Sequence, residues 1–193
     1  MKVLIACEFS GIVRDAFIAK GHDAVSCDIL PTEKPGPHYQ GNVLDILGKP
    51  WDMMIAHPPC TYLSNAGAVH YYSKKAKNVA DRIRKGMLGK EFFIKLLNAD
   101  IHKICIENPN PLRMFKLPGY SQVIHPYQFG HPYSKRTLLW LKNLPPLRST
   151  DIIKDFQSTK IPGNWFNKGG KDRQRNRAVT FQGIADAMAD QWG

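Results

Sequence analysis

The chain has 193 residues, of which 43% are hydrophobic and 22% are charged. A chain of this size and balance can bury one hydrophobic core, which excludes a disordered tail, a collagen-like chain and a disulfide-stapled mini-protein. Lys and Arg number 27 against 16 Asp and Glu, which gives a net charge of +11. So basic a protein is a candidate for a polyanionic partner such as nucleic acid. We expect a single domain over residues 1–193.

The chain lacks an apolar run of the roughly 18–20 residues needed to cross a bilayer. Its first apolar run, Val3–Cys7, reaches Glu8 after only five residues, too few for a signal-peptide core. We therefore expect a cytoplasmic protein with no membrane partner and with reduced thiols. The four cysteines are widely spaced and form no CxxC pair, so we expect no metal site.

Strand-like and helix-like patterns alternate along the first two thirds of the chain. Short apolar runs typical of buried parallel strands lie at Val3–Cys7, Ala24–Asp28, Met53–Ala56 and Ile104–Ile106. Helical spacing is found at Ile12–Lys20, Val43–Leu47 and 76–98, the last weakened by Gly86 and Gly89. Loops are expected at 30–41 and 61–73. This alternation predicts an α/β parallel sheet with right-handed crossovers.

The last third of the chain departs from this alternation. Ser121–Phe129 and Thr137–Leu141 predict two strands joined by a turn, a hairpin that adds antiparallel strands to one edge of the sheet. Residues 142–180 are rich in Pro, Gly and basic side chains, so we expect a basic irregular insertion there. Ile184–Trp192 predicts a closing helix.

Two blocks concentrate the positive charge. Residues 74–90 hold seven Lys and Arg against one acid, and residues 160–177 hold six against one. Aromatic residues lie near both blocks, as a phosphate-tracking surface requires. A basic surface kept for solubility is the alternative. We expect nucleic-acid contacts from Lys74, Lys75, Arg82, Lys168, Lys171, Arg173, Arg175 and Arg177.

The predicted strands end in polar side chains, at the edge where open α/β sheets bind ligands. Glu8-Phe9-Ser10-Gly11 leads into a helix whose first N–H groups we expect to be free. Asp28 ends the second strand, where a carboxylate can accept hydrogen bonds from a ribose diol. Together they indicate a nucleoside-type cofactor site, although an ordinary strand-to-helix turn would explain residues 8–11 alone.

The other two strand ends carry a thiol and a carboxyl group. Cys60 follows a stiff turn made by Pro58 and Pro59, and we interpret it as a nucleophile rather than a small apolar filler. We interpret His57 as a structural or supporting residue. Glu107 either pairs with a basic residue or, if it is desolvated, has a raised pKa and donates a proton to a ring nitrogen of a bound base.

In their order along the chain, these residues resemble the motifs of the cytosine-C5 methyltransferase family. Pro58-Pro59-Cys60 resembles its catalytic Pro-Cys motif, and Glu107-Asn108-Pro109 is similar to its Glu-Asn-Val motif. Glu8–Gly11 resembles its acid-x-Phe-x-Gly loop, Asp28 its ribose acid and Gly41-Asn42 its Gly-Asp pair. Arg136 is similar to the second residue of its two-arginine motif, and Gly183–Trp192 to its last helix. Here the acid is one place closer to Phe, Asn replaces the Asp of the pair, and the first arginine is missing.

The resemblance implies a Rossmann-like sheet that binds S-adenosylmethionine, and methyl transfer to C5 of cytosine in DNA. It implies a covalent bond from Cys60 to C6 of the base, with Glu107 assisting at N3 and Arg136 orienting the ring. The cofactor contacts that it implies are Glu8, Phe9, Ser10, Gly11, Asp28, Asn42 and Pro58.

The chain also departs from the family, whose members usually carry a sizeable target-recognition domain. Only residues 142–180 are available for one here, a compact layout similar to that of small methyltransferase-like proteins in phage genomes. This likeness implies the cytoplasm of a bacterial or phage-infected host cell. Two alternatives therefore stay open: a non-catalytic nucleic-acid-binding protein on this scaffold, and the same chemistry on RNA or a free nucleotide. In DNA or RNA, the target base must leave the base stack or be unpaired already to reach such a site. Residues 61–73 suit a loop that closes over the base, and a plain surface connection is the alternative.

Overall fold

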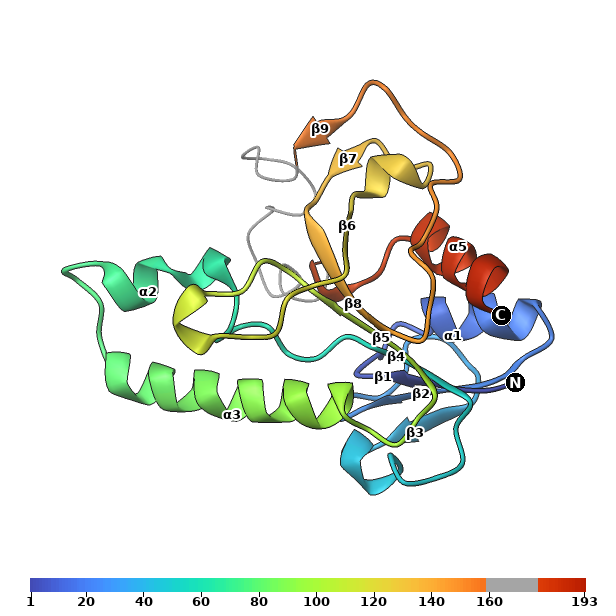
Figure 1. Cartoon of the computed structure of the whole chain (residues 1–193), viewed down its shortest axis with the longest axis horizontal. Helices are drawn as coiled ribbons and strands as arrows, with labels where there is room; N and C mark the ends of the chain where they lie inside the picture. The colour runs from blue at the N-terminus through green and yellow to red at the C-terminus, as the bar shows by residue number, and fades with distance from the viewer. Residues whose placement is uncertain (159–176) are drawn as a thin grey trace.

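The computed structural model describes residues 1–158 and 177–193, which are built around a seven-stranded sheet (Figure 1). The strands lie in the order β3-β2-β1-β4-β5-β8-β6. Their bounds are Lys2–Ala6 (β1), Asp23–Asp28 (β2), His38–Gln40 (β3), Met53–Ala56 (β4), Lys103–Asn108 (β5), Gln122–Ile124 (β6) and Thr137–Lys142 (β8). Neighbours from β3 to β5 pair in parallel, and β8 runs antiparallel to both β5 and β6. The predicted Rossmann-like sheet, mostly parallel with an antiparallel hairpin at one edge, is confirmed.

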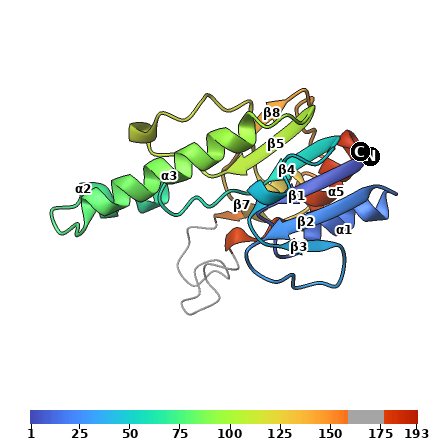
Figure 2. The same cartoon turned by 90° about the horizontal axis from the view of Figure 1, so that it is seen from below.

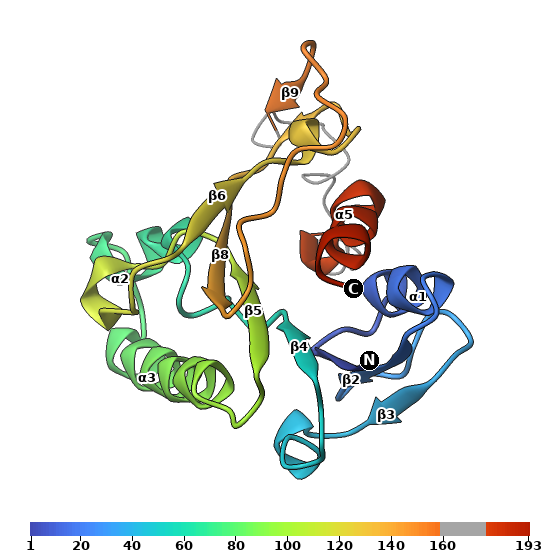
Figure 3. The ribbon, with the colours of Figure 1, turned by 45° about the vertical axis from the view of Figure 1, so that its right-hand side comes forward.

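Helices cover both faces of this sheet (Figure 3). Helices α1 (Ile12–Ala19) and α5 (Gln182–Trp192) pack against each other on one face, and α3 (Val79–Leu97) lies on the other. Because successive strand residues point to opposite faces, β1 buries Val3 and Ile5 under α1 and α5, and Leu4 on the α3 side. Apolar side chains on both faces explain the continuous apolar runs of the parallel strands.

The shorter elements lie in the connections. They are the 3-10 turns Val43–Asp45 (η1), Asn65–Gly67 (η2), Arg113–Phe115 (η3) and Pro126–Gln128 (η4), the helix Val69–Tyr72 (α2), and a two-stranded sheet of Tyr133–Ser134 (β7) with Gln157–Ser158 (β9). No helix among the described residues is both long and apolar enough to cross a membrane.

The structure corrects three predicted boundaries. Residues 30–41, expected to form a loop, contain the edge strand β3, which is too short to show a periodic pattern. The predicted strand 121–129 shortens to β6, because Pro126 lacks the N–H that a strand ladder needs and begins η4 instead. Strand β5 extends past Ile106, so Glu107 and Asn108 belong to the ladder with β8.

Residues 61–73 fold into a small lobe with α2, η3 and the first half of α3, which we call the α2–α3 lobe (Figures 1 and 2). Its core consists of Leu63, Tyr71, Leu112 and Phe115. The Tyr71 hydroxyl donates to the Tyr62 carbonyl at 2.7 Å, which fixes the ring inside the lobe. An open loop or plain connection was expected here. Leu63 and Tyr71 from that stretch contribute to a core instead.

Helix α3 runs unbroken through the two glycines that were expected to weaken it. Gly86 is buried, and a Cβ there would overlap the Phe115 ring, so glycine permits the close approach of η3 to α3. At Gly89, a Cβ would be 3.4 Å from Leu63 Cγ, an ordinary contact distance.

We expect Gly86→Ala to lower the free energy of unfolding by about 1–3 kcal/mol, because the added methyl overpacks the lobe. Gly89→Ala in the same helix is the matched control and should change it by about 1 kcal/mol or less, in the stabilising direction, through helix propensity. Urea unfolding of both variants measures the difference. Equal stability of the two variants would show that the Phe115 contact does not constrain the helix.

Candidate active site

The register of β4 with β5 brings two predicted site residues to the same level of the sheet. Ala56 pairs with Ile106, so the next residues, His57 and Glu107, lie side by side at the carboxyl ends of these strands. His57 Nδ1 is 3.0 Å from Glu107 Oε2, and the two side chains are only 7% and 17% exposed. The supporting role interpreted for His57 therefore has a geometric basis.

Glu107 is held as a carboxylate. Burial alone would raise the pKa of its carboxyl group, but the hydrogen bond from His57 and the positive charge of Lys135 outweigh burial and lower that pKa below its usual value. Of the two alternatives left open by the sequence, pairing with a basic residue is the one found. The raised pKa is contradicted.

Cys60 lies in the turn that follows β4, close enough to Glu107 for their charges to interact. Its carbonyl accepts hydrogen bonds from the amides of Leu63 at 3.0 Å and Ser64 at 2.8 Å, so the chain turns sharply behind it. Burial raises the pKa of the Cys60 thiol, the charge of Glu107 raises it further, and the charges of Lys135 and Arg177 lower it. The thiol and the carboxylate thus share one environment.

A short antiparallel pairing holds the chain segments that leave these two residues. The Asn65 amide donates to the Asn110 carbonyl at 2.8 Å, and the Leu112 amide donates to the Leu63 carbonyl at 2.7 Å. Residues 63–65 follow Cys60 and residues 110–112 follow Glu107. The α2–α3 lobe is therefore tied to both strand ends, which limits how far the thiol can move from the carboxylate.

Lys135 is the described Lys or Arg whose charge acts on both Cys60 and Glu107, although nothing in the sequence singled it out. Arg136, predicted to be catalytic, instead donates from Nη2 to the Tyr120 hydroxyl at 3.0 Å, with its guanidinium 5.7 Å from that ring's centre. It is not among the described charges that act on Cys60 or Glu107. Adjacent residues of an extended chain point in opposite directions. The side chain of Arg136 contacts Tyr120, and its catalytic role stays a prediction.

The first N–H groups of α1 were expected to be free, but a side chain of the protein occupies them. Glu8 is 4% exposed, and its carboxylate accepts hydrogen bonds from the amides of Val13 at 2.7 Å and Arg14 at 3.2 Å. The Ser10 hydroxyl donates to the same carboxylate at 3.1 Å. A carboxylate satisfies the unpaired amides of a helix amino terminus and is stabilised by the helix dipole. Glu8 therefore caps α1, and Gly11, at φ 74°, lets the chain turn into it.

The end of β2 suits a nucleoside better than the end of β1 does. Asp28 Oδ1 accepts a hydrogen bond from the Leu30 amide at 2.9 Å, and the neighbouring Ile29 and Leu30 side chains are 75% and 50% exposed. A partly exposed carboxylate beside open apolar side chains suits a ribose diol and an adenine ring. Asn42 follows the end of β3. Its side chain accepts a hydrogen bond from the Leu44 amide at 3.1 Å and caps η1.

A buried arginine that the sequence did not mark organises this region. Arg14 is fully buried, and its guanidinium donates to four oxygens of β2 and the following loop: Ser26 Oγ, Thr32 Oγ1, Lys34 O and Pro35 O. The loop after Asp28 is thereby fixed against α1. Of the other predicted cofactor contacts, Pro58 is buried, and the Phe9 carbonyl accepts a hydrogen bond from the Glu33 amide at 2.9 Å.

The predicted nucleic-acid contacts divide into four groups. Lys74 and Lys75 are exposed on the α2–α3 lobe. Arg82 is half-buried, with its guanidinium 4.9 Å from the ring centre of Tyr62 and 5.2 Å from that of Tyr71, so it braces the lobe. Arg177 is exposed, and its charge acts on Cys60. Four others, Lys168, Lys171, Arg173 and Arg175, lie outside the described residues.

The chain matches no protein-family model and no curated protein. Solved structures similar to it include three methyltransferases. They are a protein assigned as a DNA modification methyltransferase encoded within an E. coli prophage (14% identity, TM-score 0.44, 73% of this chain and 46% of that one), EhMeth of Entamoeba histolytica (15%, 0.46, 82% and 57%) and a mutant of Spodoptera frugiperda DNMT2 (18%, 0.42, 81% and 56%). The chain thus spans about half the length of these structures.

We expect Lys135→Gln to raise the pKa of the Cys60 thiol and Glu107→Gln to lower it, because one variant removes a nearby positive charge and the other a negative one. Arg136→Gln, one residue away, is the control and should leave that pKa unchanged. The pH dependence of iodoacetamide alkylation, followed by mass spectrometry of the Cys60 peptide, measures all three. If Arg136→Gln shifts the pH dependence of Cys60 alkylation and Lys135→Gln does not, Arg136 rather than Lys135 is the cation that acts on the thiol.

Proposed function

We propose that this protein is an S-adenosylmethionine-dependent methyltransferase that acts on C5 of cytosine in DNA. The observation that carries the proposal is the register of β4 with β5, which places Glu107 beside the chain that leads into the Cys60 turn, with the thiol within range of the Glu107 charge. A thiol and an acid–base group at one heterocycle are what addition at C6 with assistance at N3 requires. The ordered motif set found in the sequence supports the same chemistry.

Charge supports a polyanionic substrate. The chain carries a net charge of +11. The α2–α3 lobe extends beyond the carboxyl ends of β4 and β5 (Figure 2), and Lys74 and Lys75 in it are exposed. A cytosine can reach a thiol held behind a rigid turn only when it has left the base stack or is already unpaired. We therefore place the phosphates on the lobe and the extruded base between the two strand ends.

The donor-binding part of the proposal is supported by the edge formed by β1, β2 and β3. Asp28 has the chemistry to bind a ribose, and the exposed Ile29 and Leu30 can cover an adenine ring. When bound, S-adenosylmethionine would supply an electrophilic methyl group. Glu8 would act indirectly by holding the turn at residues 8–11, since both of its oxygens already accept protein hydrogen bonds.

Cys60 is assigned the nucleophilic step. Its sulfur forms a bond to C6 of cytosine and gives up its proton, and the electron pair of the C5–C6 double bond shifts so that C5 becomes nucleophilic. Once C5 carried the methyl group, a base would take the C5 proton, the electron pair of that C–H bond would form the C5–C6 double bond again, and the Cys60 thiolate would leave C6. Because the resting thiol has a raised pKa, the positive charges of Lys135 and Arg177 are needed to favour the thiolate.

Glu107, His57 and Lys135 are assigned the charge that develops on the base. Addition at C6 places negative charge on N3 and the C2 carbonyl, so a proton or a cation must meet it there. The hydrogen bond between Glu107 and His57 lets the pair share a proton that can be delivered to N3. Lys135, rather than Arg136, is then the cation available to the carbonyl oxygen.

Incubation with cofactor and a 5-fluorocytosine oligonucleotide tests the function, because fluorine replaces the C5 proton and blocks release of the thiol. We expect a covalent complex whose intact mass equals protein plus methylated oligonucleotide, and no complex for Cys60→Ala. Cys105→Ala removes a fully buried thiol of β5 and should still form the complex. Glu107→Gln should slow its formation by about 10²–10⁴-fold, the usual weight of general acid–base catalysis.

The same experiment separates the alternatives. A complex with RNA or a free nucleotide, and none with DNA, would assign the chemistry to that substrate. Salt-dependent DNA binding without cofactor binding or a covalent complex would support the non-catalytic alternative. Undiminished complex formation by Cys60→Ala would overturn the assigned nucleophile.

A further inference from the structure

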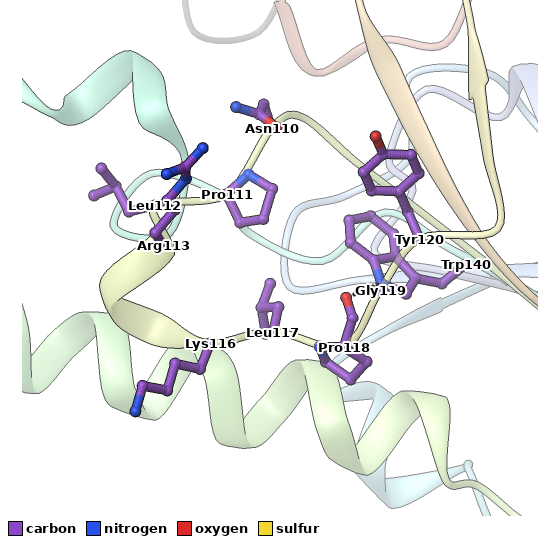
Figure 4. Close-up of a pocket in the computed structure, with 10 residues that line it drawn as sticks. All are labelled: Asn110, Pro111, Leu112, Arg113, Lys116, Leu117, Pro118, Gly119, Tyr120 and Trp140. Carbon is purple, nitrogen blue, oxygen red and sulfur yellow. Dashed lines mark hydrogen bonds between the residues drawn. The ribbon is translucent and has the colours of Figure 1, made fainter.

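A groove of about 360 Å³ lies on the α3 side of the sheet, next to the end of β5 (Figure 4). Pro111 and Leu117 form its apolar floor, and Tyr120 and Trp140 form one wall. This volume is near the lower end of the range for ligand sites, about 300–1,000 Å³, and suits one small flat molecule rather than a duplex. None of the roles assigned above to Cys60, Glu107 or the nucleoside edge uses this groove.

The wall of the groove is a braced aromatic face. Tyr120 is 44% exposed, while its ring packs edge-on against Trp140 at 6.3 Å, and Trp140 in turn packs edge-on against Phe93 at 5.0 Å. Trp140 Nε1 donates to the Pro118 carbonyl at 2.8 Å, which fixes the indole. The Tyr120 ring is therefore presented to the groove in one orientation, at little further entropic cost to a ligand that stacks on it.

The charges around this face are all positive. Arg113 and Lys116 line the groove, both exposed, and no acidic side chain is among its ten lining residues. Arg136 adds a third cation, held on Tyr120 by the 3.0 Å hydrogen bond to its hydroxyl. An open aromatic face with cations at its rim favours a planar ring that carries a phosphate.

The groove also shares its chain segments with the active site. Asn110, on its rim, lies three residues after Glu107, and Arg136 directly follows Lys135. Neighbouring residues of these two segments thus serve the two sites from opposite sides of the sheet. Because β8 runs antiparallel to β5, both sites lie where β5 ends and β8 begins.

We propose that this groove binds an unpaired nucleotide of the substrate strand next to the target cytosine, with the base stacked on Tyr120 and the phosphate held by Arg113 and Arg136. The proposal rests on the proposed function, because it takes the occupant from the strand that carries the target. Stacking is tolerant of base identity, so the groove holds the strand in place without reading its sequence. It supplies strand contacts in a chain that lacks a large recognition domain.

The first test measures binding of a fluorescent single-stranded oligonucleotide with one cytosine, by anisotropy at fixed salt and without cofactor. Tyr120→Ala should weaken binding by about 5- to 100-fold, the usual effect of removing one stacking platform. Tyr120→Phe keeps the ring and should bind within about threefold of the original protein. Tyr39→Ala, which removes a 36%-exposed tyrosine from the opposite sheet edge, is the control and should bind normally.

The second test locates the base by placing one abasic site at each position of the oligonucleotide in turn. For the original protein, one abasic position next to the cytosine should lower the affinity by the same factor as Tyr120→Ala. In Tyr120→Ala, that lesion should have no further effect. Equal affinity of Tyr120→Ala and the original protein, or additive effects at every position, overturns the proposal.

Two further measurements keep the outcome interpretable. If Tyr120→Ala loses its circular-dichroism melting transition, Arg113→Gln replaces it and should lower the slope of log affinity against log salt by about one phosphate contact. An unchanged slope then counts against the groove. The binding tests need no methyl transfer. If the abasic lesion and Tyr120→Ala are coupled but Cys60 forms no covalent complex, the groove proposal stands and the proposed enzyme activity is rejected. If Cys60 forms the complex but the lesion and Tyr120→Ala are not coupled, the enzyme activity stands and the groove proposal is rejected.

Discussion

The parallel register of β4 with β5 is the constraint on which the rest of the site depends. With Ala56 opposite Ile106, the residues that follow must emerge side by side, which places His57 against Glu107 and starts the Cys60 turn next to both. A slip of one residue would turn either side chain to the opposite face of the sheet. The paired segments 63–65 and 110–112 then hold the chain beyond each strand, so the thiol and the carboxylate cannot separate without unfolding the α2–α3 lobe.

The sequence was sufficient for what local pattern determines. Apolar runs bounded by polar strand ends located four of the five parallel strands, and Cys60 and Glu107 followed from the rule that ligands bind at carboxyl ends. The sequence was not sufficient where contacts between distant residues determine a strand or the ionisation of a side chain. The three-residue strand β3 exists because β2 provides its partners, and the ionisation of Glu107 depends on a ring fifty positions away in the chain.

Lys135 and Arg136 show most clearly why motif matching stops short. Both are cations just before β8, and only the direction of the extended backbone decides which one faces Glu107 and which one faces Tyr120. The sequence cannot fix that parity, because it depends on where β8 enters the ladder with β5 and β6. The same parity separates the two sites that we propose, one for a reacting base and one for the strand that carries it.

Solvent exchange at C5 of cytosine tests most directly whether Cys60 and Glu107 act on one ring. Addition of a thiol at C6 makes C5 exchange its hydrogen with water, so the exchange reports addition without any methyl donor. For an oligonucleotide tritiated at C5, we predict release of tritium by the original protein, none by Cys60→Ala and a strongly reduced rate for Glu107→Gln. Release that survives Cys60→Ala, or is indifferent to Glu107→Gln, would contradict the account.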